Sequence, residues 1–143
     1  MPTLRTATRG DAAAIRTLLE LNALPTADLT TAQPEFVVAY EGSKLLGAGA
    51  LQNLTEAALL RSVVVSAEHR ASGVGCLIVQ ELERRAREEG FPELVLLTQT
   101  AQRFFERQGY RVIERQRAPE GVKQSEEFRS LCPESAVCMS KAL

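Results

Sequence analysis

Apolar positions in the first part of the chain follow a helical spacing after a short extended start. Residues 3–7 favour a strand, and apolar side chains then recur three and four positions apart, at Ala12, Ile15, Leu18 and Leu19. This spacing predicts a helix over 12–22, with Thr8 as its N-cap and Asp11 in the place of the usual capping-box glutamate. Pro25 is expected to end it, and residues 26–34 to hold a second short helix closed by Pro34.

The middle of the chain changes to strand patterns and then to a long amphipathic helix. The apolar runs 36–41 and 45–53 flank Gly42-Ser43-Lys44, which predicts a β-hairpin. Residues 59–65 end in three valines and predict a central strand. A helix is expected over 73–89, ending at Gly90, because one apolar stripe runs along it: Val74, Leu77, Ile78, Leu82 and Ala86.

The last third predicts alternating strands and helices. The almost wholly apolar segment 93–98 has the pattern of a buried strand. The following segments predict, in order, a helix over 100–108 ending at Gly109, a strand over 110–116, a polar loop with one helical turn over 118–130, and a final strand over 136–143. This order predicts an α/β fold, a mixed sheet with helices on both faces, and one domain over 1–143.

Composition narrows the classes of function. The chain has 143 residues, 45% of them hydrophobic and 24% charged, the balance of a globular protein. A net charge of -1 disfavours a nucleic-acid partner, which usually needs a basic face. We expect no membrane partner, because no run approaches the about 20 apolar residues of a span, and no signal peptide. Cys76, Cys132 and Cys138 are an odd set without a C-x-x-C pair, which favours reduced thiols and a cytoplasmic location.

The segment with the strongest chemical signal joins the central strand to the long helix. It contains Arg70-x-x-Gly73-x-Gly75 immediately before and within the first turn of that helix. The first amides of a helix lack intrahelical partners and the helix dipole adds positive charge, so such a start suits a pyrophosphate. The alternative is a glycine turn that serves only tight helix–strand packing. A Walker A motif is excluded because no G-K-[ST] follows, and a dinucleotide G-x-G-x-x-G because Ile78 occupies the third glycine position.

R-x-x-G-x-G after an apolar strand resembles the acetyl-CoA loop of the GNAT N-acetyltransferases, and AxxFFERQGYRVI (101–113) resembles that family's second motif. The resemblance covers the whole chain and implies the GNAT fold and an acetyl-CoA cosubstrate, with no metal. It implies that Val63, Val64 and Val65 pair with the pantetheine arm and that the Val65 amide is an oxyanion donor. It further implies that Phe105 lies near the sulfur and that the pyrophosphate is surrounded by Arg70, Ala71, Ser72, Gly73, Val74, Gly75 and Cys76.

The chain departs from the family pattern at its expected acid and base. Many relatives have a tyrosine, thought to protonate the thiolate, where this chain has Phe105; Tyr110 and Cys138 are possible substitutes. Some relatives carry a glutamate where this chain has Leu60. An amine is only about 0.1% neutral near pH 7.4, so its proton needs an acceptor. The first candidate for this base is Glu56 and the second is Glu35. For each, the alternative is a solvated surface carboxylate. The sole histidine, His69, is interpreted as a loop residue.

Arg61 is a charged residue inside an apolar strand and therefore needs a partner. Two interpretations stay open. The guanidinium either binds a carboxylate or other oxyanion of the acceptor in the cleft, or pairs with a glutamate of the chain itself.

Three segments, 24–30, 58–65 and 126–143, are similar to the small GNAT proteins of bacterial arsenic-resistance operons. That resemblance implies acetylation of the amino group of a small, amino-acid-like molecule, such as the arsenical arsinothricin. The alternatives are an acetyl-CoA-binding sensor without turnover and an enzyme that acetylates protein amines. A homodimer is a further expectation from the resemblance. The three cysteines match the number of thiolates that trivalent arsenic prefers, but nothing in the sequence brings them together.

Overall fold

The structure is a computed structural model that describes residues 2–131 and 135–143. The strands are β1 (Thr3–Thr6), β2 (Glu35–Glu41), β3 (Lys44–Asn53), β4 (Ala58–Val65), β5 (Glu93–Thr98), β6 (Arg111–Val112) and β7 (Val137–Ala142). The α-helices are α1 (Ala12–Leu21), α2 (Leu29–Ala32), α3 (Val74–Glu88), α4 (Gln102–Arg107) and α5 (Glu120–Lys123). Short 3-10 turns cover Arg9–Asp11, Ala67–His69 and Arg115–Arg117, and a π-helical turn covers Glu127–Leu131.

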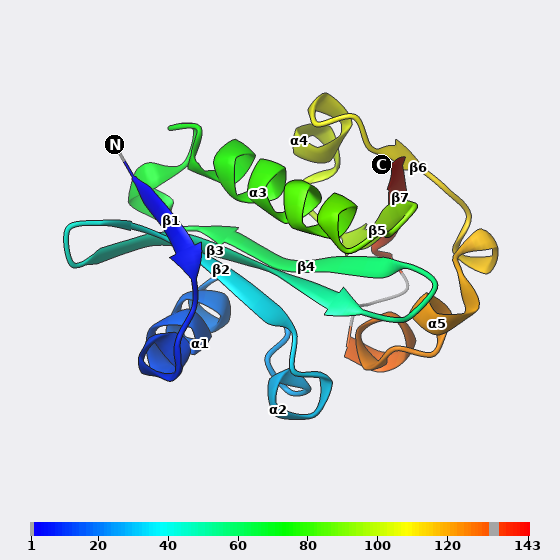
Figure 1. Ribbon diagram of the computed structural model, residues 1–143, viewed down its shortest axis with the longest axis horizontal. Helices are drawn as coiled ribbons and strands as arrows, with labels where there is room; N and C mark the ends of the chain where they lie inside the picture. Colours follow the sequence, from blue (N-terminus) through cyan, green and yellow to red (C-terminus); the bar gives the residue numbers. More distant parts are fainter. Residues whose placement is uncertain (1, 132–134) are drawn as a thin grey trace.

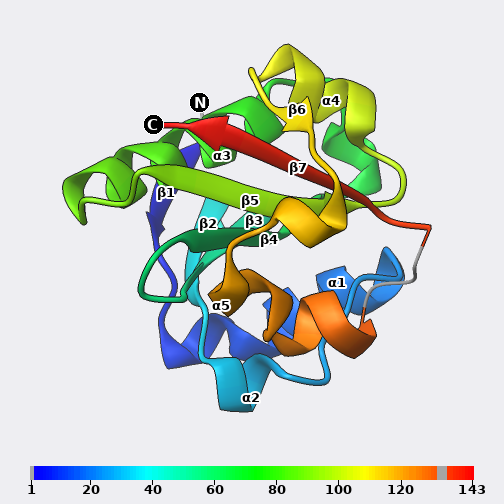
Figure 2. The same ribbon diagram turned by 90° about the vertical axis from the view of Figure 1, so that its right-hand side faces the viewer.

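The strands form one mixed sheet in the order β1-β2-β3-β4-β5-β7-β6. Neighbouring strands are antiparallel except for β4 and β5, which are parallel. Helices α3 and α4 lie on one face of this sheet, and α1, α2 and α5 lie on the other (Figures 1 and 2). The expected α/β architecture, a mixed sheet with helices on both faces, is confirmed. Among the described residues, none of the helices is both long and apolar enough to cross a membrane.

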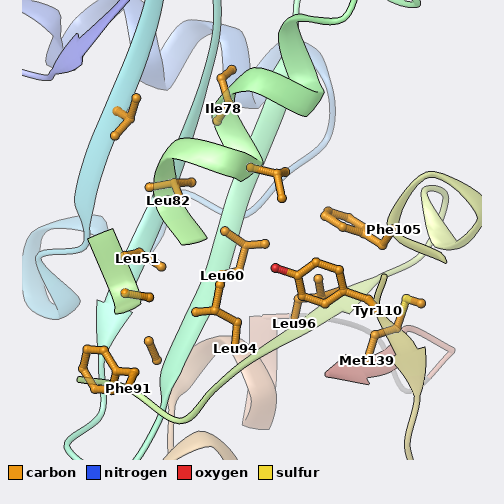
Figure 3. Close-up of a cluster of buried hydrophobic side chains, with 14 of the residues drawn as sticks. Leu51, Leu60, Ile78, Leu82, Phe91, Leu94, Leu96, Phe105, Tyr110 and Met139 are labelled. Carbon is orange, nitrogen blue, oxygen red and sulfur yellow. The ribbon is translucent and has the colours of Figure 1, made fainter. Parts of the chain in front are cut away.

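The larger core lies between α3 and the sheet (Figure 3). Ile78 and Leu82 of α3 are fully buried against β3, β4 and β5. The helix comes this close because β3 carries glycines: a Cβ on Gly49 would lie 2.7 Å from Ile78 Cγ2, and one on Gly47 would lie 2.7 Å from the Val64 carbonyl oxygen. The small residues of β3 therefore allow α3 to pack closely on the strand. Burial of the apolar face of α3 contributes favourably to the free energy of folding.

The opposite face is covered by two separate segments. Ile15 and Leu19 of α1 pack on Val38, Ala48 and Val64. Further along the sheet, Val122 of α5 and Phe128 of the π-helical turn pack against Leu59, Val95 and Cys138. These two segments therefore cover different parts of the same face.

A β-bulge interrupts β4. Val64 lies opposite Ala48, but Arg61 lies opposite Ala50, so β4 has one residue more than β3 between these pairs. Ser62 accommodates the extra residue with a left-handed φ of 58°. Bulges of this kind generally bend the strand that carries them and increase its twist.

One sequence prediction for the last third was wrong and one was incomplete. A strand was expected over 110–116, but only Arg111–Val112 pairs, with β7, and Arg115–Arg117 forms a 3-10 turn. The chain leaves the sheet because Ile113 makes the last contact, donating its amide to the Cys138 carbonyl, after which Arg115 turns to bind the Ala136 carbonyl. Residues 118–130 were expected to form a polar loop with one helical turn; α5 provides that turn, but the segment also contains most of the π-helical turn, and its apolar side chains pack on the sheet. Other boundaries differ by one or two residues, as helix ends commonly do.

Candidate active site

A cleft opens where β4 and β5 separate. The two strands pair at Ala58–Leu94 and Leu59–Val95, near their amino ends. Further along, residues 60–65 of β4 and 96–101 at the end of β5 line a cavity of about 740 Å³. The loop after α1, residues 22–25, and Glu127, Leu131 and Ala136 complete its walls, and Arg70 and Phe105 also line it. The cleft therefore lies at the carboxyl ends of the two parallel strands.

The backbone of β4 presents an amide to this cleft. Ser66 donates its amide to the Leu46 carbonyl at 2.8 Å, on the β3 side of the strand. Successive amides in a strand point to opposite edges, so the Val65 amide points away from β3 and toward the separating β5. Val65, which lies opposite Gly47, lines the cavity. A hydrogen-bond donor is thus directed into the open space between the strands.

The loop after β4 shapes the amino end of α3. Gly73 is the N-cap of the helix with a φ of 89°, and Ala71 has a φ of 64°. The first intrahelical bond runs from the Leu77 amide to the Gly73 carbonyl, so the amides of the preceding residues point out of the helix end. Ser72 Oγ bonds to the His69 carbonyl, and the Arg70 guanidinium bonds to Asn22 Oδ1 at the end of α1. Exposed amides and a guanidinium therefore lie at one end of the cleft.

The two glycines of the loop differ in their surroundings. A Cβ on Gly73 would have no neighbour within 4 Å, so open space lies beside it. A Cβ on Gly75 would lie 3.3 Å from the Phe104 ring. Gly75 is therefore needed for close packing, which was the alternative to phosphate binding. Gly73, in contrast, provides the left-handed turn and leaves the backbone open to a ligand. Cys76 accepts a hydrogen bond from Gln108 Nε2 at 3.1 Å on Sγ, which joins the first turn of α3 to α4.

Phe105 closes the cleft on the α4 side. It is 6% exposed and makes edge-to-face contacts with Phe104 at 5.0 Å and with Tyr110 at 5.6 Å between ring centroids. Phe105 and Tyr110 are labelled in Figure 3. Thr98, at the end of β5, also lines the cavity and accepts the Ala101 amide on Oγ1 at 3.0 Å. The aromatic ring thus forms an apolar wall beside a polar backbone edge.

A buried ionic network lies behind the cleft. Arg61 makes a bidentate contact with Asp28, 2.6 Å on each side, and donates to Gln52 Oε1 at 2.9 Å. Its Nε lies 3.4 Å from Glu127 Oε1. The side chains of Arg61, Asp28 and Glu127 are 0%, 4% and 4% exposed. Of the two interpretations of Arg61, the structure shows pairing within the chain, with an aspartate as the main partner and a glutamate as the second.

The profile of the Acetyltransferase (GNAT) domain matches residues 32–112, more than half of the chain. The chain belongs to the GNAT acetyltransferase family. It is 35% identical over 82 residues to the uncharacterized N-acetyltransferase YjcF of Bacillus subtilis, covering 57% of this chain and 59% of that protein. It is 34% identical over 104 residues to the uncharacterized N-acetyltransferase CT2212 of Chlorobaculum tepidum, covering 72% and 64%. The chain therefore spans less than two thirds of the length of these curated relatives.

Solved structures of GNAT proteins share the fold. The N-acetylglutamate synthase of Neisseria gonorrhoeae, complexed with coenzyme A and N-acetyl-glutamate, matches with a TM-score of 0.85 and 19% identity, over 100% of this chain and 35% of that one. Rv2747 of Mycobacterium tuberculosis, in complex with CoA and NLQ, matches with a TM-score of 0.83 and 26% identity, over 99% of both chains. The GNAT fold expected from the sequence is confirmed.

The structure does not bring the carboxylates expected as bases into the GNAT cleft. Glu56 lies in the β3–β4 turn, at the end of β4 remote from Val65, where it is exposed and accepts the Gly121 amide at 3.3 Å. Glu35 is exposed at the start of β2 and pairs with Arg85 at 3.1 Å. These placements correct the prediction for Glu56 and favour a solvated carboxylate for both residues. His69 lies in the loop, as expected, with Nδ1 2.9 Å from Ser66 Oγ.

The substitutes considered for the missing tyrosine also lie outside the cavity lining. Tyr110 donates its hydroxyl to Glu83 Oε2 at 2.9 Å, and burial together with this carboxylate raises the pKa of the phenol. Burial raises the pKa of the Cys138 thiol to about 11. Neither group therefore has the position or the acidity of a proton donor in the cleft.

The described cysteines lie apart from one another. Cys76 is half-buried on α3, and Cys138 is buried in β7 within the cluster on the opposite face of the sheet. Cys132 lies outside the described residues. Among the residues that the structure describes, no group of three histidine, cysteine or acidic side chains could hold a metal ion.

Sequence reasoning missed Glu127 and Asn22. Glu127 follows the exposed Glu126 and precedes Phe128 in a segment that the pattern assigned to a loop. The apolar residues Val122, Phe128 and Leu131 were a signal that this segment packs on the sheet. No local signal indicated that Glu127 faces Arg61, because the bulge that directs β4 there is invisible in the sequence.

Proposed function

We propose that this chain is an acetyl-CoA-dependent N-acetyltransferase that acts on the amino group of a small molecule. The observation that carries the proposal is the cleft itself, whose lining includes Val65 and also Arg70, three residues before the N-cap of α3. Membership of the GNAT family supports it. Acetyl-CoA is an extended thioester with a pyrophosphate, and the cleft offers a strand edge for the first part and a helix end for the second.

The residues divide into three roles along the cleft. The edge of β4 at Val63, Val64 and Val65 binds the pantetheine arm, and the Val65 amide donates to the thioester oxygen as negative charge develops there. Phe105 packs beside the sulfur. The pyrophosphate is bound by the loop and the first turn of α3, that is, by Arg70, Ala71, Ser72, Gly73, Val74, Gly75 and Cys76. Arg70 must exchange or share its bond to Asn22 when the anion binds.

The acceptor is proposed to be amino-acid-like. The structurally similar N-acetylglutamate synthase of Neisseria gonorrhoeae was solved with coenzyme A and N-acetyl-glutamate, an acetylated amino acid, and the 26% identical Rv2747 with CoA and NLQ. The finer proposal, an arsenical amino acid such as arsinothricin, rests on the similarity of segments 24–30, 58–65 and 126–143 to arsenic-resistance proteins. Arg61 is already bound to Asp28. An anionic group of the acceptor could therefore bind Arg61 only by joining this pair or by displacing Asp28.

Calorimetry with acetyl-CoA tests the cosubstrate site. Wild-type protein should bind acetyl-CoA, and Arg70→Glu should weaken binding by at least about tenfold, because one charge is reversed beside the pyrophosphate. Arg16→Glu, at an exposed position of α1 outside the cavity lining, is the matched control and should bind normally. Equal affinity of wild type and Arg70→Glu would contradict the proposed loop.

Thiol release tests turnover. Purified protein and acetyl-CoA are incubated with L-glutamate, L-glutamine, arsinothricin or spermidine, and free coenzyme A is measured. Release with at least one amine supports the enzyme, and the identity of that amine decides the finer proposal. Binding of acetyl-CoA without release on the whole panel would favour the alternative, a sensor that has lost turnover.

A further inference from the structure

The proposed reaction needs a group that removes a proton from the acceptor. Amines are almost fully protonated at neutral pH, and an ammonium ion has no lone pair with which to attack a thioester. The group that accepts this proton must lie within hydrogen-bond reach, directly or through one water. Of the described residues that line the cavity, Glu127 is the only one with a carboxylate or imidazole side chain.

Glu127 is held at the acceptor end of the cleft. It belongs to the π-helical turn Glu127–Leu131, whose two ends, Glu127 and Leu131, both line the cavity opposite the loop after α1. Its side chain is 4% exposed, and the Ser125 hydroxyl, which accepts the Phe128 amide, helps to anchor the turn. The carboxylate is thus fixed at the wall of the cavity that also contains the Val65 amide.

The contacts of Glu127 with its ionic neighbour are weaker than those of Asp28. Arg61 places two nitrogens 2.6 Å from the Asp28 carboxylate, whereas its Nε lies 3.4 Å from Glu127 Oε1. Asp28 therefore neutralises most of the guanidinium charge, and Glu127 is an acidic group in a low-dielectric site with an incomplete counter-charge. Such a group accepts a proton readily.

We propose that Glu127 is the general base that deprotonates the acceptor ammonium in the GNAT cleft; this inference rests on the proposed function. Glu127 takes one proton from R–NH₃⁺ and becomes a neutral acid. The resulting amine attacks the thioester carbonyl carbon, the C–N bond forms, and the Val65 amide binds the oxyanion. The C–S bond then breaks, the thiolate takes the remaining ammonium proton to give coenzyme A, and Glu127 releases its proton to solvent.

The electrostatic environment fits this role. Burial, opposed by Arg61 on β4 and reinforced by Asp28 before α2, raises the pKa of Glu127 to about 7. Gln52 on β3 and Ser62 on β4, which also contact Arg61, are uncharged. A base is most effective when its pKa lies near the working pH, since it is then largely ionised and still basic.

The test compares Glu127→Gln with wild type on the amine that gives the fastest thiol release. The amide preserves size but does not accept the proton, so kcat should fall by about 10² to 10⁴. Affinity for acetyl-CoA, measured by calorimetry, should stay within about twofold. In wild type, kcat should decline as the pH falls below about 7, and this decline should be absent in the variant.

Two comparisons separate a base from a structural residue. Glu126→Gln changes the exposed neighbour outside the cavity lining and should keep wild-type kcat. Hydroxylamine, which is already uncharged at neutral pH, should be acetylated by Glu127→Gln at close to the wild-type rate, because it needs no base. A variant that lost the reaction with hydroxylamine to the same extent would show that Glu127 only supports the cleft, and the inference would be overturned.

Failure of the inference and failure of the proposed function give different results. If wild type acetylates an amine and Glu127→Gln acetylates it equally fast with the same pH profile, the enzyme stands and the base is wrong. If wild type binds acetyl-CoA but transfers acetyl to no amine on the panel and not to hydroxylamine, the proposed function fails and the inference fails with it.

Discussion

Two residues in or beside the proposed acetyl-CoA cleft have a left-handed backbone conformation although neither is a glycine. Ser62 forms the β4 bulge with a φ of 58°, and Ala71 forms the loop before α3 with a φ of 64°. A side chain in this region costs about 1 to 2 kcal/mol, and it persists only where the surrounding structure enforces it. Both residues set the direction of backbone amides in or beside the cleft, so the chain maintains this strain where binding is proposed.

Replacing Ala71 by glycine should therefore stabilise the protein. Glycine removes the left-handed penalty, while its greater freedom in the unfolded chain opposes folding by about 0.4 to 1 kcal/mol. The net gain in the free energy of unfolding should be about 0.5 to 1 kcal/mol, measured by urea denaturation. The matched control is Ala14→Gly, at an exposed position inside α1, which should lose about 0.5 to 1 kcal/mol. A loss at both positions would show that Ala71 is unstrained.

At the scale of elements, α3 packs closely on β3 because β3 has glycines where the helix approaches it. The segment Gly47-Ala48-Gly49-Ala50 lies beneath α3, and Gly49 faces Ile78 and Leu82 (a Cβ there would be 2.7 and 2.9 Å from their methyl groups). A methyl group added at this position must push the helix outward or force these side chains out of their rotamers.

Gly49→Ala should accordingly destabilise the protein by about 1 to 3 kcal/mol, the usual effect of overpacking. Gly10→Ala is the matched control, because a Cβ there meets only Thr8 Oγ1, at 3.6 Å, and it should change stability by less than about 0.5 kcal/mol. Thermal unfolding followed by circular dichroism measures both. A Gly49→Ala variant as stable as wild type would mean that α3 moves away from β3 at little energetic cost.

The sequence predicted those elements whose pattern is strong and local. The hairpin of β2 and β3, the apolar β5 and most of the stripe of α3 lie where expected, because their burial follows directly from periodicity. Leu77 was expected in that stripe but is 40% exposed. The strand over 110–116 was too long because its alternation continues after the chain has turned away from β7 at Ile113. The segment 118–131 was missed as a packed unit because its turns of four and five residues are shorter than the window in which helical periodicity is visible.

Pairing over long distances in the sequence could not be predicted in the same way. Arg61 was recognised as a charge that needs a partner, but the partners are Asp28, Gln52 and Glu127, which lie 33, 9 and 66 positions away along the chain. Glu56 was chosen as the base because it precedes β4 in the sequence, yet β4 carries it to the end remote from the cleft. Motifs therefore indicated the proposed cosubstrate loop, whereas the proposed base, Glu127, could be identified only from the fold.

At the scale of the whole molecule, the network around Arg61 joins four segments that are otherwise separate. The loop before α2 contributes Asp28, β3 contributes Gln52, β4 contributes Arg61 and Ser62, and the π-helical turn contributes Glu127. Arg61→Met should destabilise the protein by about 3 to 5 kcal/mol, because it leaves Asp28 buried without a counter-charge. The double variant Arg61→Met with Asp28→Leu should recover a large part of that loss, as urea denaturation would show. If the double variant were less stable than Arg61→Met alone, the pair would contribute little and packing would dominate.

The pH dependence of stability reports the same network through Glu127. In the unfolded chain this carboxyl ionises near its ordinary pKa of 4.5, whereas in the folded protein the pKa is about 7. Between these values the folded state holds a proton that the unfolded state has lost, so the free energy of unfolding must fall as the pH rises through this window and level off above it. With about 1.4 kcal/mol per pKa unit, the fall is on the order of 3 kcal/mol.

Glu127→Gln should remove this slope, because an amide does not titrate, while Glu126→Gln should keep it. Urea denaturation at intervals from about pH 5 to about pH 8 measures all three proteins. The carboxylate of Asp11, whose pKa is held well below 3.8 by hydrogen bonds from Arg5 and the Thr8 amide, changes stability only at lower pH and leaves this window clear. A wild-type stability that stayed level between about pH 5 and about pH 7 would show that folding does not raise the pKa of Glu127. Its carboxylate would then be too weakly basic to take a proton readily from an ammonium ion, which would contradict the base inferred for the cleft.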